Sequence, residues 1–257
     1  MEKTELKNFL EEKVNFFNRP VFIETDPISI PHRYARKEDR EISGFLAATI
    51  SWGNRVSILK NGVKLMHLMD DQPFLFIKDA GGRDLQHFRN FVHRTFNESD
   101  ILFFIEALRY IYQYKDGLEA AFADGFIGRQ INVYPAIMHF RQCFLEVPHL
   151  PRSEKHIADP SSGSTAKRIN MFLRWMVRQD EKGVDFGIWR RILPSQLCCP
   201  LDVHSGRSAR SLGLLNRKQN DWKAVIELTE QLKNLDPEDP VKYDFALFGM
   251  GVSNMNS

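Results

Sequence analysis

Apolar residues recur at helical spacing along most of this 257-residue chain. Over residues 39–50 they stand at i, i+3, i+4, i+7 and i+8, which predicts a helix with one buried face. Apolar helical runs also predict helices over 4–17, 56–69, 100–114, 134–145, 202–212, 222–233 and 241–250, and one that begins at Lys167. Sustained alternation of apolar and polar residues, which marks strands, is sparse. The pattern predicts an all-α fold.

The helix that begins at Lys167 has one apolar side and one basic side. Lys167, Arg174 and Arg178 share the basic side at spacings of seven and eleven residues. A Ser/Gly-rich loop precedes the helix, and such a loop can present backbone N–H groups to an anion beside the helix dipole. We expect a phosphate-binding surface here, and a solvated charged face is the alternative. The loop residues are Ser161, Ser162, Gly163, Ser164 and Thr165.

The distribution of charge points to the same region. Residues 151–218 contain 13 Lys/Arg and 6 Asp/Glu, a net charge of +7. The rest of the chain has 22 basic and 27 acidic residues, a net charge of −5. A basic segment in an otherwise acidic chain is typical of a surface that binds a polyanion.

The three cysteines, Cys143, Cys198 and Cys199, do not form a disulfide pattern, because their number is odd and two are adjacent. They predict small buried hydrophobic residues in a reducing compartment, and we expect a cytoplasmic protein. No apolar run is long enough to cross a bilayer, and the charged N-terminus lacks the apolar segment of a signal peptide. We therefore expect no membrane partner.

Asp202 stands at the start of a predicted helix. It follows Pro200 by two residues, and Asp is a favoured N-cap. Gly213 suits the C-terminal cap of the same helix. An N-cap carboxylate is held in a fixed position, so Asp202 could also act in chemistry; plain capping is the alternative.

The segment Leu201-Asp202-Val203-His204, followed by Arg207 and Leu212-Gly213, resembles the helix-hairpin-helix base-excision DNA glycosylases. This superfamily includes the endonuclease III, adenine-mismatch and 8-oxoguanine glycosylases. Residues 42–54 and 244–251 are similar to its early and final helices, so the resemblance spans most of the chain in the right order. The pattern looks closest to an uncharacterised bacterial branch.

The resemblance implies a single glycosylase-like unit of two helical lobes, with a flipped-out base held in the cleft between them. We expect one lobe over about 38–179 and the other over about 1–37 plus 180–257. The implied partner is double-stranded DNA, bound by a monomer. The implied reaction is excision of a damaged base such as 8-oxoguanine, with strand cleavage as well if a lysine takes part.

Two residues would carry this chemistry. Asp202 would stabilise the positively charged sugar or activate a nucleophile, and the neutral amine of Lys167 would displace the base and form a Schiff base. Besides the loop residues 161–165, the expected DNA-binding residues are Arg168, Arg174, His204, Arg207, Asn54 and Arg55. The expected aromatic residues of the base pocket or wedge are Trp52, Trp175, Phe186 and Trp189.

The chain departs from the superfamily pattern at the hairpin. Alignment of Pro160 and Gly163 puts Thr165 at the usual lysine position and Lys167 two residues later, so a lysine-free, monofunctional enzyme stays open. The four-cysteine iron–sulfur loop of several relatives is missing, because no cysteine follows Cys199, and we expect no cluster and no other cofactor. We also expect no metal site, since His204 has no second ligand at suitable spacing.

Two other functions stay open at this stage. One is a DNA-binding module on the same fold that has no catalytic activity, and the other is a helical protein–protein adaptor. The sequence does not specify the lesion, because base specificity depends on the shape of the pocket.

Overall fold

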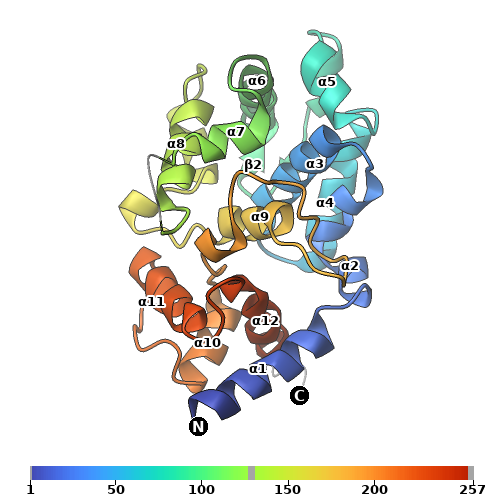
Figure 1. Ribbon diagram of the computed structural model, residues 1–257. Coiled ribbons are helices and arrows are strands. Elements are labelled where there is room, and N and C mark those ends of the chain that lie inside the picture. The colour runs from blue at the N-terminus through green and yellow to red at the C-terminus, as the bar shows by residue number, and fades with distance from the viewer. Residues whose placement is uncertain (1, 127–130, 254–257) are drawn as a thin grey trace. The chain divides into compact units, whose positions relative to one another are not determined.

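The computed structural model describes residues 2–126 and 131–253 (Figure 1). The described residues form α-helices, short 3-10 turns and one antiparallel pair of strands, β1 (Val92–His93) and β2 (Phe96–Asn97). The all-α prediction is confirmed. The helices are α1 (Lys3–Phe17), α2 (Val21–Thr25), α3 (Lys37–Thr49), α4 (Arg55–His67), α5 (Pro73–Asp79), α6 (Glu98–Tyr114), α7 (Gly117–Ala123), α8 (Tyr134–Phe144), α9 (Lys167–Val177), α10 (Val203–Ser211), α11 (Trp222–Lys233) and α12 (Asp244–Ser253).

The described chain divides into two compact units. Unit 1 comprises residues 2–22, 131–134 and 159–253, and unit 2 comprises residues 23–126 and 135–158. The expected lobes placed residues 159–179 with the preceding segment, whereas these residues belong to unit 1. The reason is electrostatic, because Arg174 and Arg178 pair with aspartates that lie further along the chain in unit 1.

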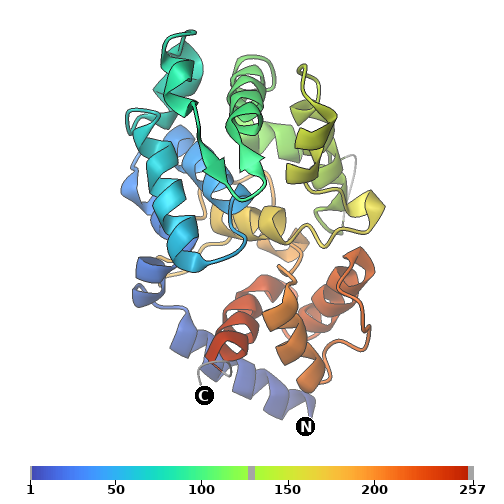
Figure 2. The same ribbon diagram turned by 180° about the vertical axis from the view of Figure 1, so that it is seen from behind.

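Unit 2 has a core of phenylalanine rings. Phe45 of α3 stacks on Phe104 of α6 with ring centroids 5.8 Å apart, and Phe122 of α7 stacks on Phe140 of α8 at 4.0 Å. The β1–β2 hairpin leads directly into α6 (Figure 2). Asn97 and Asp100 form a capping box at that junction, which satisfies backbone N–H groups at the helix start.

In unit 1, α12 packs against both α1 and α10 (Figure 1). Two glycines of α12 permit this close approach. A Cβ added at Gly249 would lie 2.4 Å from the ring of Phe17 in α1. A Cβ added at Gly251 would lie 2.7 Å from the carbonyl oxygen of His204 in α10. Since α10 begins directly after Asp202, α12 helps to fix the position of that residue.

A buried network of ion pairs holds α9 in unit 1. Arg174 is 3% exposed. Its Nε lies 3.2 Å from Asp185 Oδ1, and its Nη1 lies 2.5 Å from Asp244 Oδ2. Arg178 is equally buried and pairs with Asp185, Asp180 and Asp239. Buried charges are tolerated only when paired and hydrogen-bonded in this way. The expectation that Arg174 and Arg178 face phosphate was therefore wrong, because their guanidinium groups are occupied inside the protein.

Most predicted helices are present within a few residues of the expected bounds. The turn-rich connector expected around Pro20, Pro27 and Pro31 contains α2 and two 3-10 turns, and neither α5 nor α7 was predicted. Cys143, Cys198 and Cys199 are buried and free, as expected. Among residues 2–126 and 131–253, no helix combines the length and the apolar character that a membrane span requires.

Candidate functional site

The loop before α9 is held together by Asp159. Its carboxylate accepts hydrogen bonds from the backbone N–H groups of Ser161 and Ser162 at 2.9 and 3.3 Å. The Ser161 hydroxyl donates to the same carboxylate, and the Ser162 hydroxyl donates to the Asp159 carbonyl oxygen. These two backbone groups therefore do not point outward to an anion, which corrects the expected phosphate seat at this part of the loop.

The second half of the loop turns the chain into α9. Gly163 has φ +91°, a conformation that favours glycine, and its carbonyl accepts a hydrogen bond from Trp222 N at the start of α11. Ala166 is also left-handed, with φ +48°. The Thr165 carbonyl accepts a hydrogen bond from the Asn170 side chain, and the Ser164 hydroxyl accepts one from Ala166 N. These contacts fix where Lys167 begins the helix.

Asp202 is the N-cap of α10, as the sequence predicts. Its Oδ1 accepts hydrogen bonds from the backbone N–H groups of His204 and Ser205 at 2.8 and 3.0 Å. Ser205 completes a capping box, since its hydroxyl accepts from Asp202 N and donates to the Pro200 carbonyl. Oδ1 is thus used for capping, while Oδ2 lies near Lys167 Nζ.

Lys167 and Asp202 lie next to each other within unit 1. Lys167 Nζ is 3.7 Å from Asp202 Oδ2, and the two side chains are 23% and 24% exposed. The ammonium group also lies 5.7 Å from the centre of the Phe248 ring and 3.4 Å from Met171 Sδ. The two residues are 35 positions apart in the chain, and the structure brings their side chains together.

His204 packs against the same phenylalanine. Its ring packs edge-on against Phe248 at 6.3 Å, and its buried Nδ1 has no hydrogen-bond partner among the described residues. Arg207 is exposed one turn further along α10, and Arg168 is half-buried beside Lys167. Burial lowers the pKa of Arg168 to about 10, so its guanidinium stays charged at neutral pH. Contacts from these three residues to DNA stay predictions.

Asp244 is a further member of the site that the sequence analysis missed. It stands at the start of α12, is 5% exposed and accepts the 2.5 Å hydrogen bond from Arg174. Burial raises the pKa of Asp244 to about 6; the charges of Arg174 and Lys167 oppose this shift, and the charge of Asp202 adds to it. The available signal was a lone carboxylate at the start of an apolar helix, which by itself suggests only a cap.

Cys199 is buried and interacts electrostatically with the same groups. Burial raises the pKa of its thiol well above the usual value, and the negative charges of Asp244 and Asp202 act in the same direction. A protonated thiol is a much weaker nucleophile than a thiolate. Among the described residues, no group of three or more His, Cys, Asp or Glu is arranged to hold a metal ion.

Two of the four candidate aromatic residues are buried in the core of unit 1. Trp175 is 0% exposed and Trp189 is 1% exposed, with the latter packed edge-on against Phe172. Both belong to the core, so the expectation that they form a pocket or wedge was wrong. Phe186 is half-buried and gives its backbone N–H to the Trp175 carbonyl.

Three further candidates lie in unit 2. Trp52 is half-buried, stacks on His156 at 5.8 Å and packs edge-on against His93. Asn54 caps α4 by accepting a hydrogen bond from Ser57 N. Arg55 Nη2 lies 3.9 Å from Asp26 Oδ2. Their expected roles in DNA binding stay predictions.

A family model described as "Protein of unknown function (DUF2400)" matches residues 26–253. The chain belongs to this family. The match covers Lys167, Asp202 and Asp244, and it leaves α1 outside. No curated protein and no solved structure matches the chain.

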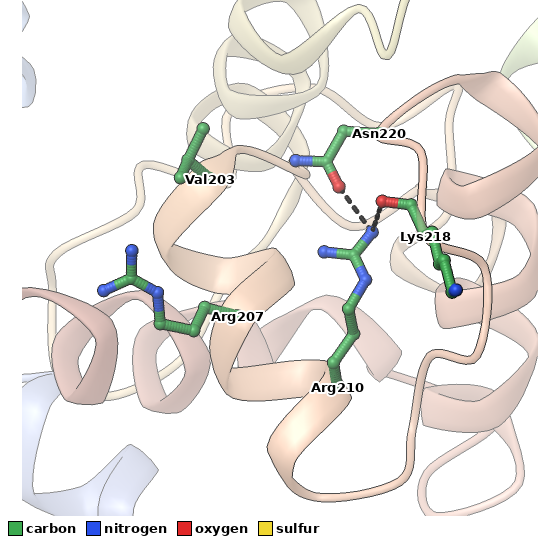
Figure 3. A pocket seen from close by; sticks show the side chains of 5 residues that line it. All are labelled: Val203, Arg207, Arg210, Lys218 and Asn220. Carbon is green, nitrogen blue, oxygen red and sulfur yellow. Dashed lines mark hydrogen bonds between the residues drawn. The ribbon is translucent and has the colours of Figure 1, made fainter.

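This DUF2400 chain has a pocket of about 450 Å³ beside Asp202. It is lined by Val203 and Arg207 of α10 together with three residues that the sequence analysis did not single out: Arg210, Lys218 and Asn220 (Figure 3). For Arg210 and Lys218 the available signal was the positive charge of residues 203–218, which contain four Lys/Arg and no Asp or Glu. For Asn220 the sequence offered no signal.

Proposed function

We propose that the chain is a DNA N-glycosylase that excises a damaged base, such as 8-oxoguanine, from double-stranded DNA. The observation that carries the proposal is the 3.7 Å separation between Lys167 Nζ and Asp202 Oδ2, both partly accessible to solvent. Cleavage of an N-glycosidic bond needs a nucleophile and an anion beside the positive charge that develops on the sugar. An amine next to a helix-capping carboxylate supplies both groups, and the resemblance of residues 201–213 supports this assignment.

In the proposed reaction, the neutral amine of Lys167 attacks C1′ of the damaged nucleotide. The bond between C1′ and the base breaks, and its electron pair leaves with the base, which takes up a proton. Positive charge on the sugar is stabilised by the Asp202 carboxylate. Opening of the C1′–O4′ bond then gives a Schiff base, and loss of a C2′ proton expels the 3′ phosphate.

The amine must lose a proton before it can attack. Asp202 Oδ2 is the carboxylate oxygen 3.7 Å away, and it is the oxygen that does not cap α10. In the proposed mechanism the lysine proton passes to the departing base, and the Asp202 carboxylate stays ionised and faces the sugar cation. If water is the nucleophile instead, Asp202 activates it and Lys167 has only an electrostatic role, as in a monofunctional enzyme.

A second candidate function is a DNA-binding protein without catalysis. The observation that favours it is the capping box at Asp202, since capping alone accounts for an aspartate at this position. On this alternative the ion pair between Lys167 and Asp202 is structural. Asp202→Asn would then leave duplex binding and every other function unchanged.

The test is a panel of duplexes, each with one damaged base, incubated with the full chain in the presence of borohydride. Borohydride reduces a Schiff base to a stable covalent adduct between enzyme and DNA. We expect an adduct with the wild type and none with Lys167→Gln. The matched control is Lys7→Gln, which removes the same charge from an exposed position on α1.

The outcomes separate the candidate functions. An adduct that persists in Lys167→Gln would show that another amine is the nucleophile. Base release without any adduct would indicate a monofunctional enzyme. Duplex binding without base release from any lesion would favour the non-catalytic alternative, and the lack of salt-sensitive duplex binding would favour the protein–protein adaptor.

A further inference from the structure

The pocket beside Asp202 is lined by positive charge and by no acidic side chain. Arg207, Arg210 and Lys218 supply the charge, and Asn220 and Val203 complete the lining (Figure 3). Its volume of about 450 Å³ lies within the range of roughly 300–1,000 Å³ that is typical of small-ligand sites. All five residues belong to unit 1, on α10 and on the segment that leads to α11.

Arg210 is held in place by neutral groups. Its Nε and Nη2 donate to the Arg217 carbonyl at 2.9 and 2.7 Å, and Nη2 also donates to the Lys218 carbonyl and to Asn220 Oδ1. Nη1 makes no hydrogen bond to the described residues. These partners orient the guanidinium but carry no negative charge, in contrast to the aspartates around Arg174. Arg210 therefore keeps its full positive charge and a free donor.

The carboxylate of Asp221, the acidic residue that follows this segment, is already engaged. It pairs with Arg217 through both of its oxygens and caps α11 by accepting from Ala224 N at 3.1 Å. It therefore does not neutralise Arg207, Arg210 or Lys218. A pocket with three uncompensated cations and an oriented donor is suited to an anion with several acceptor oxygens.

Two features place this anion site next to the candidate catalytic residue. The Asn220 side chain donates to the Asp202 carbonyl oxygen at 3.1 Å, so one wall of the pocket is hydrogen-bonded to Asp202 itself. Val203 follows Asp202 directly, lines the pocket and is 65% exposed, which gives the pocket an apolar edge. Cationic groups beside an apolar edge match the phosphate and the sugar of a nucleotide.

Gly206 lies beside two of the residues that line the pocket. A Cβ at this position would lie 2.9 Å from Arg210 Nη1 and 3.1 Å from Asn220 Oδ1. A side chain there would displace the donor that has no other partner.

We propose that this pocket binds a phosphate of a polynucleotide backbone, close to the nucleotide whose base is excised. The proposal takes its substrate, DNA, from the proposed function. What it adds is the place where a phosphate binds and the residues that hold it. The pocket residues bind and position the strand and do not touch the reacting atoms. Their loss is therefore expected to weaken binding of the duplex.

The test compares Arg207→Ala/Lys218→Ala with Lys3→Ala/Lys7→Ala, which removes the same charge from exposed positions on α1. Binding of an undamaged duplex is measured by fluorescence anisotropy at several NaCl concentrations. For the pocket variant we expect Kd to rise roughly tenfold and the slope of log Kd against log salt to fall by about 1 to 2. Equal Kd and slope in the two double variants would overturn the proposal.

A second measurement, calorimetry with inorganic phosphate, distinguishes the source of the phosphate. Loss of both phosphate and duplex binding in the pocket variant supports a backbone phosphate. If the pocket variant loses phosphate binding but keeps its affinity for the duplex, the pocket binds free phosphate, and the proposal of a backbone phosphate is wrong.

Single-turnover excision separates this inference from the proposed function. If the wild type binds duplex through the pocket but releases no base, the proposed function fails and the phosphate site stands. If the wild type releases base and the pocket variant has an unchanged Kd, the phosphate site fails and the proposed function stands.

Discussion

Oδ2 of Asp244 accepts a hydrogen bond from Nη1 of Arg174 at 2.5 Å, in a core that leaves both side chains almost fully buried. The charge of Asp244 also interacts with Lys167 and Asp202. Asp244 is therefore a titratable group that interacts both with the buried ion pairs around α9 and with the candidate catalytic pair, Lys167 and Asp202.

Asp244 is expected to make the protein less stable as the pH rises from about 4 to about 6. Burial raises its pKa from 3.8 to about 6, so the folded state holds the proton more tightly than the unfolded state. The resulting stabilisation is complete below pH 3.8 and is lost as the pH rises through 6. Two pH units correspond to about 3 kcal/mol. We expect Asp244→Asn to remove this part of the pH dependence in urea unfolding curves.

The control for this experiment is Asp221→Asn. The hydrogen bond from Arg217 lowers the pKa of Asp221 to about 2, so its titration lies below this pH range. The burial that raises the pKa of Asp185 adds a slope of the same sign, which both variants retain. Asp244→Asn and wild-type curves with the same slope between pH 4 and 7 would contradict the prediction.

Asp202 has a capping role and a proposed catalytic role that substitutions can separate. Asp202→Asn and Asp202→Ser keep an oxygen that can cap α10, whereas Asp202→Ala does not. We expect the alanine variant to lose ~1 kcal/mol of unfolding free energy and the other two to lose much less. All three lack the carboxylate and are expected to slow base release roughly 100-fold or more. Urea unfolding and single-turnover excision provide the two measurements.

The pattern across the three variants decides between the roles. If Asp202→Asn excises at the wild-type rate, the carboxylate is not catalytic and the non-catalytic alternative gains support. If activity follows stability across the series, capping alone explains the residue.

Gly251 is expected to control the distance between α12 and α10. An added Cβ would meet the backbone of His204 at 2.7 Å, and a backbone atom cannot move aside as a flexible side chain can. We expect Gly251→Ala to lower the unfolding free energy by about 1–3 kcal/mol and to reduce base release, because α10 carries Asp202 at its start. The matched control is Gly82→Ala, where no atom lies within 4 Å. Equal stability of the two variants would refute the close contact.

Helical spacing in the sequence was sufficient to predict the all-α class and most of the helices. The bounds of α1 and α11 agree closely with the predicted ranges, because each of these helices buries one regular apolar side. The short helices α5 and α7 have seven residues each, too few for a periodic pattern to develop. The division into units also eluded the sequence, since it depends on ion pairs between residues far apart in the chain.

The candidate site was also predicted only where its features are local in the sequence. Asp202 was found because its capping role and its motif are local in sequence. Arg174 was misassigned because the periodicity of α9 shows which residues share a face but not whether that face meets water or buried aspartates. The tryptophans were misassigned for a similar reason, since an aromatic residue in a helix has the same pattern in a core and in a pocket. Asp244 and the phosphate pocket required the tertiary structure.

The contact between α1 and α12 has a consequence for how the chain folds during synthesis. The Tyr243 hydroxyl donates a hydrogen bond to Glu11 across a separation of 232 residues, and Phe17 packs against Gly249 in the same region. Helix α1 is synthesised long before α12, so it cannot bury its apolar side against α12 until residues 244–253 have been made. Unit 2 lies between them in sequence and is complete earlier, so it can fold first. Closing this long loop is expected to make the assembly of unit 1 the slow step.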